Sequence, residues 1–150
     1  MKNIKLFLIT LLLGMIGFSF TACEDTKDIP VYYLPIYTNL YLIGSATPVG
    51  WNIDAPVPMI VDATDPFTFT WSGQLTKGEF KIPTTKGNWG CDFFMPLVNG
   101  EADLTRATLS LVKGGNPDNK WLITDETAGN YTITINIKDQ NAYTIKFVKN

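Results

Sequence analysis

One short stretch places an aromatic ring and a cation close together, and a polar ligand could bind there. Residues 78–89 read Gly-Glu-Phe-Lys-Ile-Pro-Thr-Thr-Lys-Gly-Asn-Trp. Charged Glu79 and Lys81 alternate with apolar Phe80 and Ile82, which is the period-two pattern of a strand with one face on a core and one in water. We therefore expect Lys81 to point outward.

After Pro83 the composition changes to that of a turn, and the resulting polar loop ends in Trp89. A flat ring at the tip of such a loop, near an outward Lys, offers a stacking surface and a charged hydrogen-bond donor. A sugar ring suits this arrangement best. Lys86 and Asn88 in the same loop are further candidates for sugar contacts. Asp92 either accepts from sugar hydroxyls or only solvates the loop.

The chain has four tryptophans, and their surroundings differ. Trp71 lies in an alternating aromatic strand and is expected in the core. Trp121 follows Lys120, so an outward Lys120 would turn this indole inward. Trp89 is expected to be exposed and functional. For Trp51, in a loop after a Gly, a binding role and a packing role are equally supported.

Catalysis finds little support in the sequence, and no cofactor is expected. The chain has no histidine, which removes the commonest general base and the commonest metal ligand. The acids are scattered over turns rather than paired across a cleft, as a glycosidase requires. Cys91 is read as an ordinary packed cysteine. Asp62 and Asp65 favour an Asx turn over a calcium site, and no metal site is predicted.

The N-terminus is typical of an exported protein. Residues 1–5 are short and basic, 6–20 are almost entirely apolar, and small residues lead up to Cys23. This pattern resembles a bacterial lipobox, so residues 1–22 are predicted to be a lipoprotein signal peptide and Cys23 to be acylated. An uncleaved anchor and a plain secretory signal are the alternatives. Lipid on Cys23 would leave Cys91 without a disulfide partner.

Residues 23–38 begin with acidic side chains and continue with Pro and Tyr, so they are predicted to form a tether. The acidic start resembles the tag of lipoproteins exported to the cell surface, which implies an outer-membrane location. Without Lys2 and Lys5, the 12 basic side chains of the chain fall to 10, against 14 acidic ones. A nucleic-acid partner is therefore not expected.

Residues 39–150 are predicted to form one all-β domain, because no apolar pattern of helical period follows Cys23. Alternating or short apolar runs, separated by turns, indicate antiparallel strands that form a β-sandwich of immunoglobulin-like or starch-binding-module type. Gly73 and Gly78 are expected to bracket one turn. The expected strands cover residues 39–44, 59–61, 67–71, 78–82, 93–97, 108–112, 120–124, 129–138 and 143–148, with the last two forming a hairpin.

Several segments resemble the carbohydrate-binding domain of SusE/SusF-type outer-membrane lipoproteins. They are the run Leu-Tyr-Leu-Ile-Gly-Ser-Ala-Thr-Pro-Val-Gly-Trp-Asn from residue 40, the Gly-Glu-Phe-Lys strand, the Asn-Trp loop, the Asp-Asn-Lys-Trp run from residue 118 and the Gly-Asn-Tyr-Thr-Ile-Thr-Ile-Asn run from residue 129. The resemblance implies binding of starch or related glycans at the cell surface, near a porter and its hydrolases, without cleavage.

A looser likeness to sandwich-type starch-binding modules implies roles for Trp51, Lys81 and Trp89. Two rings would cradle an α-glucan while the lysine donates to its hydroxyls. Family members as a rule carry several modules in tandem, whereas this chain has room for one. Gly90 and Cys91 stand where many starch-binding modules have a polar or acidic group, so another neutral glycan remains open as the ligand. A scaffold lipoprotein that contacts a porter or a neighbouring lipoprotein is the alternative, and a glycoside hydrolase ranks last.

Overall fold

The computed structural model describes residues 34–150, which form strands, loops and one short 3-10 helix, η1 (Lys113–Gly115). No helix in this described part is long and apolar enough to cross a membrane. The strands are β1 (Tyr41–Leu42), β2 (Val57–Pro58), β3 (Ile60–Val61), β4 (Thr68–Leu75), β5 (Gly78–Phe80), β6 (Ile82–Pro83), β7 (Phe93–Met95), β8 (Ser110–Val112), β9 (Trp121–Ile123), β10 (Gly129–Asn136) and β11 (Thr144–Lys149).

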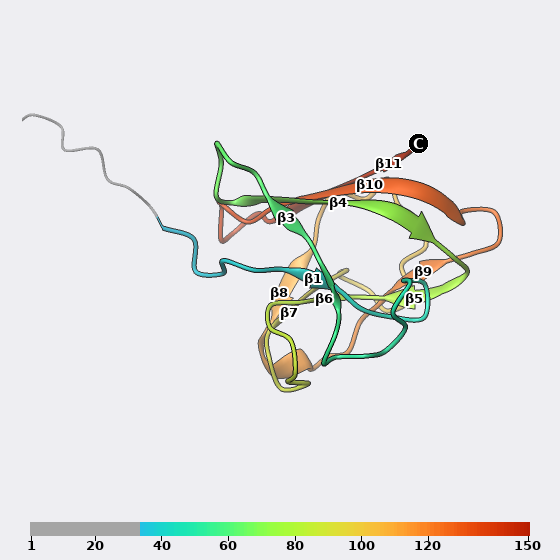
Figure 1. The fold of residues 1–150 in the computed structure, drawn as a ribbon, viewed down its shortest axis with the longest axis horizontal. Coiled ribbons are helices and arrows are strands. Elements are labelled where there is room, and N and C mark those ends of the chain that lie inside the picture. The colour runs from blue at the N-terminus through green and yellow to red at the C-terminus, as the bar shows by residue number, and fades with distance from the viewer. Residues whose placement is uncertain (1–33) are drawn as a thin grey trace, which may run out of the picture. The chain divides into compact units, whose positions relative to one another are not determined.

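A four-stranded antiparallel sheet with the order β11-β10-β4-β3 forms one layer of the domain. Figure 1 shows it along the upper side of the view, with the shorter strands below it. These pair as β1-β2, β5-β9 and β6-β7-β8, all antiparallel. The predicted class, an all-β antiparallel sandwich, is confirmed. The hairpin of β10 and β11 also agrees with the sequence, and β3 forms an edge of this sheet.

The strands of the large sheet alternate buried apolar residues with more exposed polar ones. In β10, Tyr131, Ile133 and Ile135 are buried and the residues between them are not. Ile133 lies opposite Trp71 and Ile135 opposite Phe69 on β4, so the apolar side chains of both strands share one face. That face meets the short strands and forms the core.

The buried apolar residues form two clusters, and β7 lies between them. Phe94 belongs to the main cluster, together with Phe80 and Trp121. The neighbouring Phe93 points to the second cluster, which contains Cys91, Phe93, Met95 and Val112. Because successive residues of a strand point to opposite faces, a strand covered on both sides loses the pattern of one wet face.

The packed domain begins before the predicted boundary at residue 39. Tyr37 packs edge-on against Phe94, with ring centroids 5.7 Å apart, and its hydroxyl donates to Asp92 at 2.7 Å. The end of the predicted tether therefore belongs to the domain. The predicted signal peptide, the predicted lipidation site Cys23 and the rest of the predicted tether, residues 24–33, lie outside the described residues.

One predicted turn is wrong. Gly73 was expected to open the turn before β5, but β4 continues through it to Leu75, and Gly73 pairs with Tyr131 of β10. A side chain on Gly73 would collide with the Trp71 indole. The glycine keeps the strand intact while the neighbouring ring lies over it, which local turn statistics do not reveal.

We predict that Gly44→Ala strongly destabilises the domain. Gly44 has φ +143°, and a Cβ there would collide with the backbone carbonyl of Glu79. Steric overlap and backbone strain together should lower the free energy of unfolding by about 3 kcal/mol or more. Urea unfolding of the full-length protein measures the loss.

Gly100→Ala is the matched control, because Gly100 has φ +75° but open space around its Cβ position. It should cost only about 1 to 2 kcal/mol of backbone strain. Equal unfolding midpoints for the two variants would contradict the close approach of Gly44 to Glu79.

Candidate functional site

Three loops meet at one edge of the domain: residues 44–55, residues 84–92 and the segment 113–120 around η1. The Gly87 amide donates to the Ile53 carbonyl at 2.7 Å, which joins the first two loops. A Cβ on Gly115 would lie 3.6 Å from the Trp89 carbonyl oxygen, so the third loop borders the second. Figure 1 shows the loop after β6 beside η1 at the lower edge.

The first two loops present Trp51 and Trp89 together, and we call this pair the aromatic platform. Trp51 is 38% exposed and Trp89 is 47% exposed. Their ring centroids are 6.4 Å apart and their planes are tilted by 43°. Trp51 is thus exposed, which the sequence left open. The two rings are tilted rather than coplanar.

A buried ring supports the platform from below. Phe93 of β7 is fully buried and stacks against Trp89 with centroids 6.4 Å apart and an interplanar angle of 16°. Offset stacking at this spacing is favourable for aromatic rings. Because Phe93 belongs to the second core cluster, the orientation of Trp89 depends on the packing of the interior.

The expected outward position of Lys81 is wrong. Its side chain is only 6% exposed, although it does point to the strand face opposite the one that Phe80 and Ile82 share. The second core cluster covers that opposite face. The Lys81 ammonium lies 4.1 Å from the Phe93 ring centroid and 5.3 Å from that of Trp89. Lys81 therefore sits under the platform, where its charge meets two aromatic rings.

Asp118 is the counter-ion of Lys81, and the sequence analysis missed it. The Lys81 ammonium donates to Asp118 Oδ1 at 2.6 Å, and Lys120 reaches Oδ2 at 2.8 Å. Burial raises the pKa of Asp118, but hydrogen bonds from Lys120 and Lys81 outweigh burial and hold the pKa below its usual value. Asp118 opens one of the segments that resemble the family, but nothing in the sequence linked it to Lys81, 37 positions away.

The other predicted loop residues are present at the site but have different surroundings. Lys86 is exposed. Asn88 is exposed as well, but its Oδ1 accepts the Gly90 amide at 2.8 Å and so closes the turn that carries Trp89. Asn88 therefore has a structural task in addition to any contact with a ligand.

Asp92 is already engaged in a cluster of its own. Its Oδ2 accepts from the Tyr37 hydroxyl at 2.7 Å and from Lys113 at 2.8 Å, and its Oδ1 accepts the Gly114 amide at 3.2 Å. The hydrogen bond from Lys113 is the main cause that lowers the pKa of Asp92, and the bond from Tyr37 adds to it. Asp92 joins the N-terminal segment to η1.

The remaining candidates are structural in this fold. Trp71 and Trp121 are buried in the main cluster, as expected. Asp62 Oδ1 accepts from the backbone and the hydroxyl of Thr64, which is the predicted Asx turn. Cys91 is a buried free thiol. Within residues 34–150, no three His, Cys, Asp or Glu side chains are grouped to hold a metal ion.

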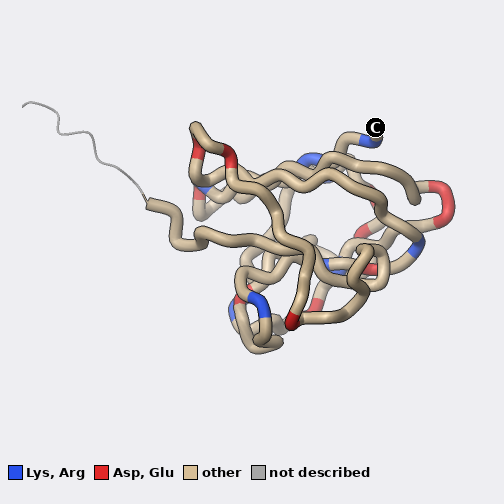
Figure 2. The backbone as a smooth tube through the Cα atoms, in the orientation of Figure 1, with Lys and Arg blue, Asp and Glu red and all other residues tan. Residues whose placement is uncertain are grey.

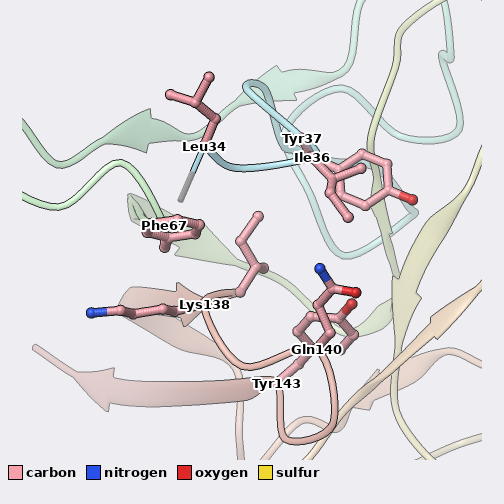
Figure 3. A pocket seen from close by; sticks show the side chains of 8 residues that line it. Leu34, Ile36, Tyr37, Phe67, Lys138, Gln140 and Tyr143 are labelled. Atoms are coloured by element: carbon pink, nitrogen blue, oxygen red, sulfur yellow. The ribbon is translucent and has the colours of Figure 1, made fainter. Parts of the chain in front are cut away.

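Three hollows in the described part of the domain have linings without a platform tryptophan. The pocket in Figure 3 has a volume of about 50 Å³ and is lined by Leu34, Ile36, Phe67 and Tyr143 among others. This pocket contains neither Trp51 nor Trp89. Two open hollows of about 420 Å³ also contain neither Trp51 nor Trp89. A ligand of the platform would bind on an open surface.

Charge does not single out an anionic partner. Figure 2 shows Lys and Arg interleaved with Asp and Glu along the described part of the chain. At the platform itself, Lys81 and Lys120 face the carboxylate of Asp118. The site combines aromatic faces with charges of both signs that pair with one another, which suits a neutral polar ligand.

A family model described as "SusF/SusE starch specific CBMs" matches residues 39–145. The chain belongs to this family. CBMs are carbohydrate-binding modules, so membership in the SusF/SusE family supports starch binding, and the resemblance noted in the sequence is confirmed. The match covers all three loops that meet at this edge of the domain. Comparisons with curated proteins and with solved structures gave no significant match.

The Asp92 cluster yields a prediction about pH. Because the folded-state pKa of Asp92 is lowered, its contribution to stability is present above its ordinary pKa of about 3.9 and is lost as pH falls through the folded value. Asp92→Asn should therefore be less stable than wild type at pH 7. The difference should shrink from about pH 5 downward.

Urea unfolding of both full-length proteins at a series of pH values measures this difference. Lys113→Met, which removes the main partner of Asp92, should show the same convergence at low pH. A constant stability gap between wild type and Asp92→Asn down to the acid transition would contradict the proposed titration.

Proposed function

We propose that this protein binds starch-like α-glucans on the aromatic platform and holds them without cleaving them. The observation that carries the proposal is the pair of exposed indoles, Trp51 and Trp89, 6.4 Å apart on neighbouring loops. Lys86 and Asn88 are exposed in the loop that carries Trp89, and we include them as contacts for hydroxyl groups of a stacked sugar. Membership in the SusF/SusE family supports the same ligand class.

The tilt between the rings favours an α-glucan over a flat β-glucan. An α-1,4-linked chain coils, so successive sugar faces turn relative to each other, whereas a β-1,4-linked chain is a flat ribbon. Planes inclined by 43° match successive faces of a coiled chain better than those of a ribbon. Each ring that stacks on a sugar contributes about 0.5 to 1.5 kcal/mol beyond the area it buries.

The carboxylates near the platform are poor candidates for hydrolysis. A glycosidase needs a general acid whose pKa is raised, beside a second carboxylate. Hydrogen bonds from lysines lower the pKa of a carboxyl group instead. The bond from Lys113 is the main cause of the lowered pKa of Asp92. The pKa of Asp118 is also lowered, because the bonds from Lys120 and Lys81 outweigh burial. This electrostatic setting supports a binding role.

A single module of this kind should bind weakly. Two stacked rings and a few hydrogen bonds that compete with water give a Kd of about 0.1 to 1 mM, or roughly −5.5 to −4 kcal/mol. Many copies on one membrane would act together on one polymer and retain it. Weak binding per module is therefore compatible with retaining starch near an uptake system.

We predict that Trp89→Ala abolishes retention by starch. Removing the more exposed ring takes away half of the platform, and the affinity for maltoheptaose should fall about 5- to 20-fold. Affinity electrophoresis of the full-length protein in gels that contain starch, with calorimetry on maltoheptaose, measures the loss. Trp51→Ala should act in the same direction.

Leu97→Ala is the matched control, because Leu97 is an exposed apolar residue outside the platform. It should migrate like wild type. Unchanged migration of the wild-type protein in gels of several α- and β-glucans would refute glycan binding. In that case, a co-purifying partner that is insensitive to Trp89→Ala would favour the scaffold role.

We also propose that the protein is anchored by lipid on Cys23 after removal of residues 1–22 and displays the domain on the outer membrane, beside a porter complex. The basic start, the apolar run and the small residues before Cys23 support this. In a Gram-negative host, Cys23→Ser should lose incorporation of labelled palmitate and leave the membrane fraction. Cys91→Ser should keep both, and palmitate labelling of Cys23→Ser at the wild-type level would refute the anchor.

A further inference from the structure

The loop that presents Trp89 is closed at its base by Asp92. The Thr84 amide and the Thr84 hydroxyl donate to the Asp92 backbone carbonyl at 3.0 and 2.9 Å, so the two ends of the loop are held together. The next residue, Phe93, stacks against Trp89. A displacement of Asp92 would therefore move both the loop that carries the indole and the ring that supports it.

The side chain of Asp92 is fixed from two other segments, which together with it form the Asp92 cluster of Tyr37, Asp92 and Lys113. Asp92 Oδ2 accepts from the Tyr37 hydroxyl at 2.7 Å and from the Lys113 ammonium at 2.8 Å. Lys113 also donates to the Tyr37 oxygen at 2.8 Å, so the three side chains form a closed triangle. The cluster thus joins the base of the Trp89 loop to the N-terminal segment and to η1.

Tyr37 is the member of the cluster that the core holds in place. Its ring packs edge-on against the fully buried Phe94, with centroids 5.7 Å apart and an interplanar angle of 84°. The Lys113 side chain is 71% exposed, and an ion pair with an exposed lysine gives a carboxylate little orientation by itself. The Tyr37 hydroxyl is therefore the fixed point from which Asp92 is oriented.

The same cluster holds η1 against the ring that supports the platform. Asp92 Oδ1 accepts the Gly114 amide at 3.2 Å, in the middle of η1. A Cβ on the next residue, Gly115, would lie 3.2 Å from the Phe93 ring. One carboxylate thus fixes the base of the Trp89 loop on one side and the segment that packs on Phe93 on the other.

We propose that Tyr37, Asp92 and Lys113 are positioning residues for glycan binding, which hold the Trp89 loop in its binding orientation without touching the glycan. This inference rests on the proposed function. It makes the affinity of the platform depend on the segment through which the chain enters the domain, where a role in binding was not expected. If the cluster is broken, part of the binding free energy is used to order the loop.

Calorimetry with maltoheptaose on the full-length protein tests the positioning role. Tyr37→Phe keeps the packing on Phe94 and removes only the hydroxyl, and it should weaken binding about 2- to 10-fold. Asp92→Ala should weaken binding at least as much. The double variant should bind no worse than Asp92→Ala alone, because the hydroxyl acts through the carboxylate. Additive losses would overturn this route.

Tyr131→Phe is the matched control. The Tyr131 hydroxyl also donates one hydrogen bond, to the Thr127 carbonyl at 2.6 Å. A lysine ammonium lies 5.8 Å from the Tyr131 ring centroid, and one lies 5.5 Å from that of Tyr37. Tyr131 belongs to β10 of the large sheet, so this variant should lose a similar amount of stability and bind maltoheptaose like wild type. Equal losses of affinity in Tyr131→Phe and Tyr37→Phe would overturn the proposal.

A measurement without ligand shows whether the loop itself is affected. The order parameter of the Trp89 indole N–H, from NMR relaxation, should fall in Tyr37→Phe and stay at the wild-type value in Tyr131→Phe. An unchanged order parameter in Tyr37→Phe would overturn the positioning role.

The two proposals fail in different ways. Absence of wild-type binding would refute the proposed function, and the order parameter of Trp89 would still decide whether the Asp92 cluster positions the loop. Wild-type binding that is lost in Trp89→Ala but fully kept in Tyr37→Phe would overturn the positioning role alone.

Discussion

The arrangement of the site depends on one buried cation. The Lys81 ammonium lies over Phe93, near Trp89, and against Asp118, so it joins the second core cluster to two of the three loops. A charge with so little access to water is tolerable only with a counter-ion and favourable surroundings, which here are a carboxylate and two ring faces. Rings and carboxylate are thereby held in one place before any ligand arrives.

This pre-organisation matters because the platform is an open surface rather than a pocket. A shallow site buries little area, so each ring and each hydrogen bond contributes a large share of the affinity. Loops that had to order themselves on binding would use up that small gain. Here the Gly87 to Ile53 hydrogen bond and the turn closed by Asn88 hold the loops in place. Rigid presentation makes weak, repeated binding along a polymer feasible.

Two polar clusters at this end of the domain have different tasks. Asp92, Tyr37 and Lys113 saturate one another and tie the N-terminal segment to η1, so they stabilise the domain. Asp118 is also paired, but half of its side chain faces water beside the platform. Two acids with lowered pKa values thus differ in their exposure to water, because different segments cover them.

Local patterns in the sequence determined most of the strands, the all-β class, the burial of Trp71 and Trp121 and the exposure of Trp89, because alternation and turn composition act between near neighbours. Tertiary structure alone decided the environment of Lys81, the pairing of Asp118 with it and the exposure of Trp51. Alternation predicted that Lys81 faces away from Phe80, but not that Phe93 and Trp89 cover that face. A partner 37 positions away leaves no periodic trace, since it meets the lysine only when the loops assemble.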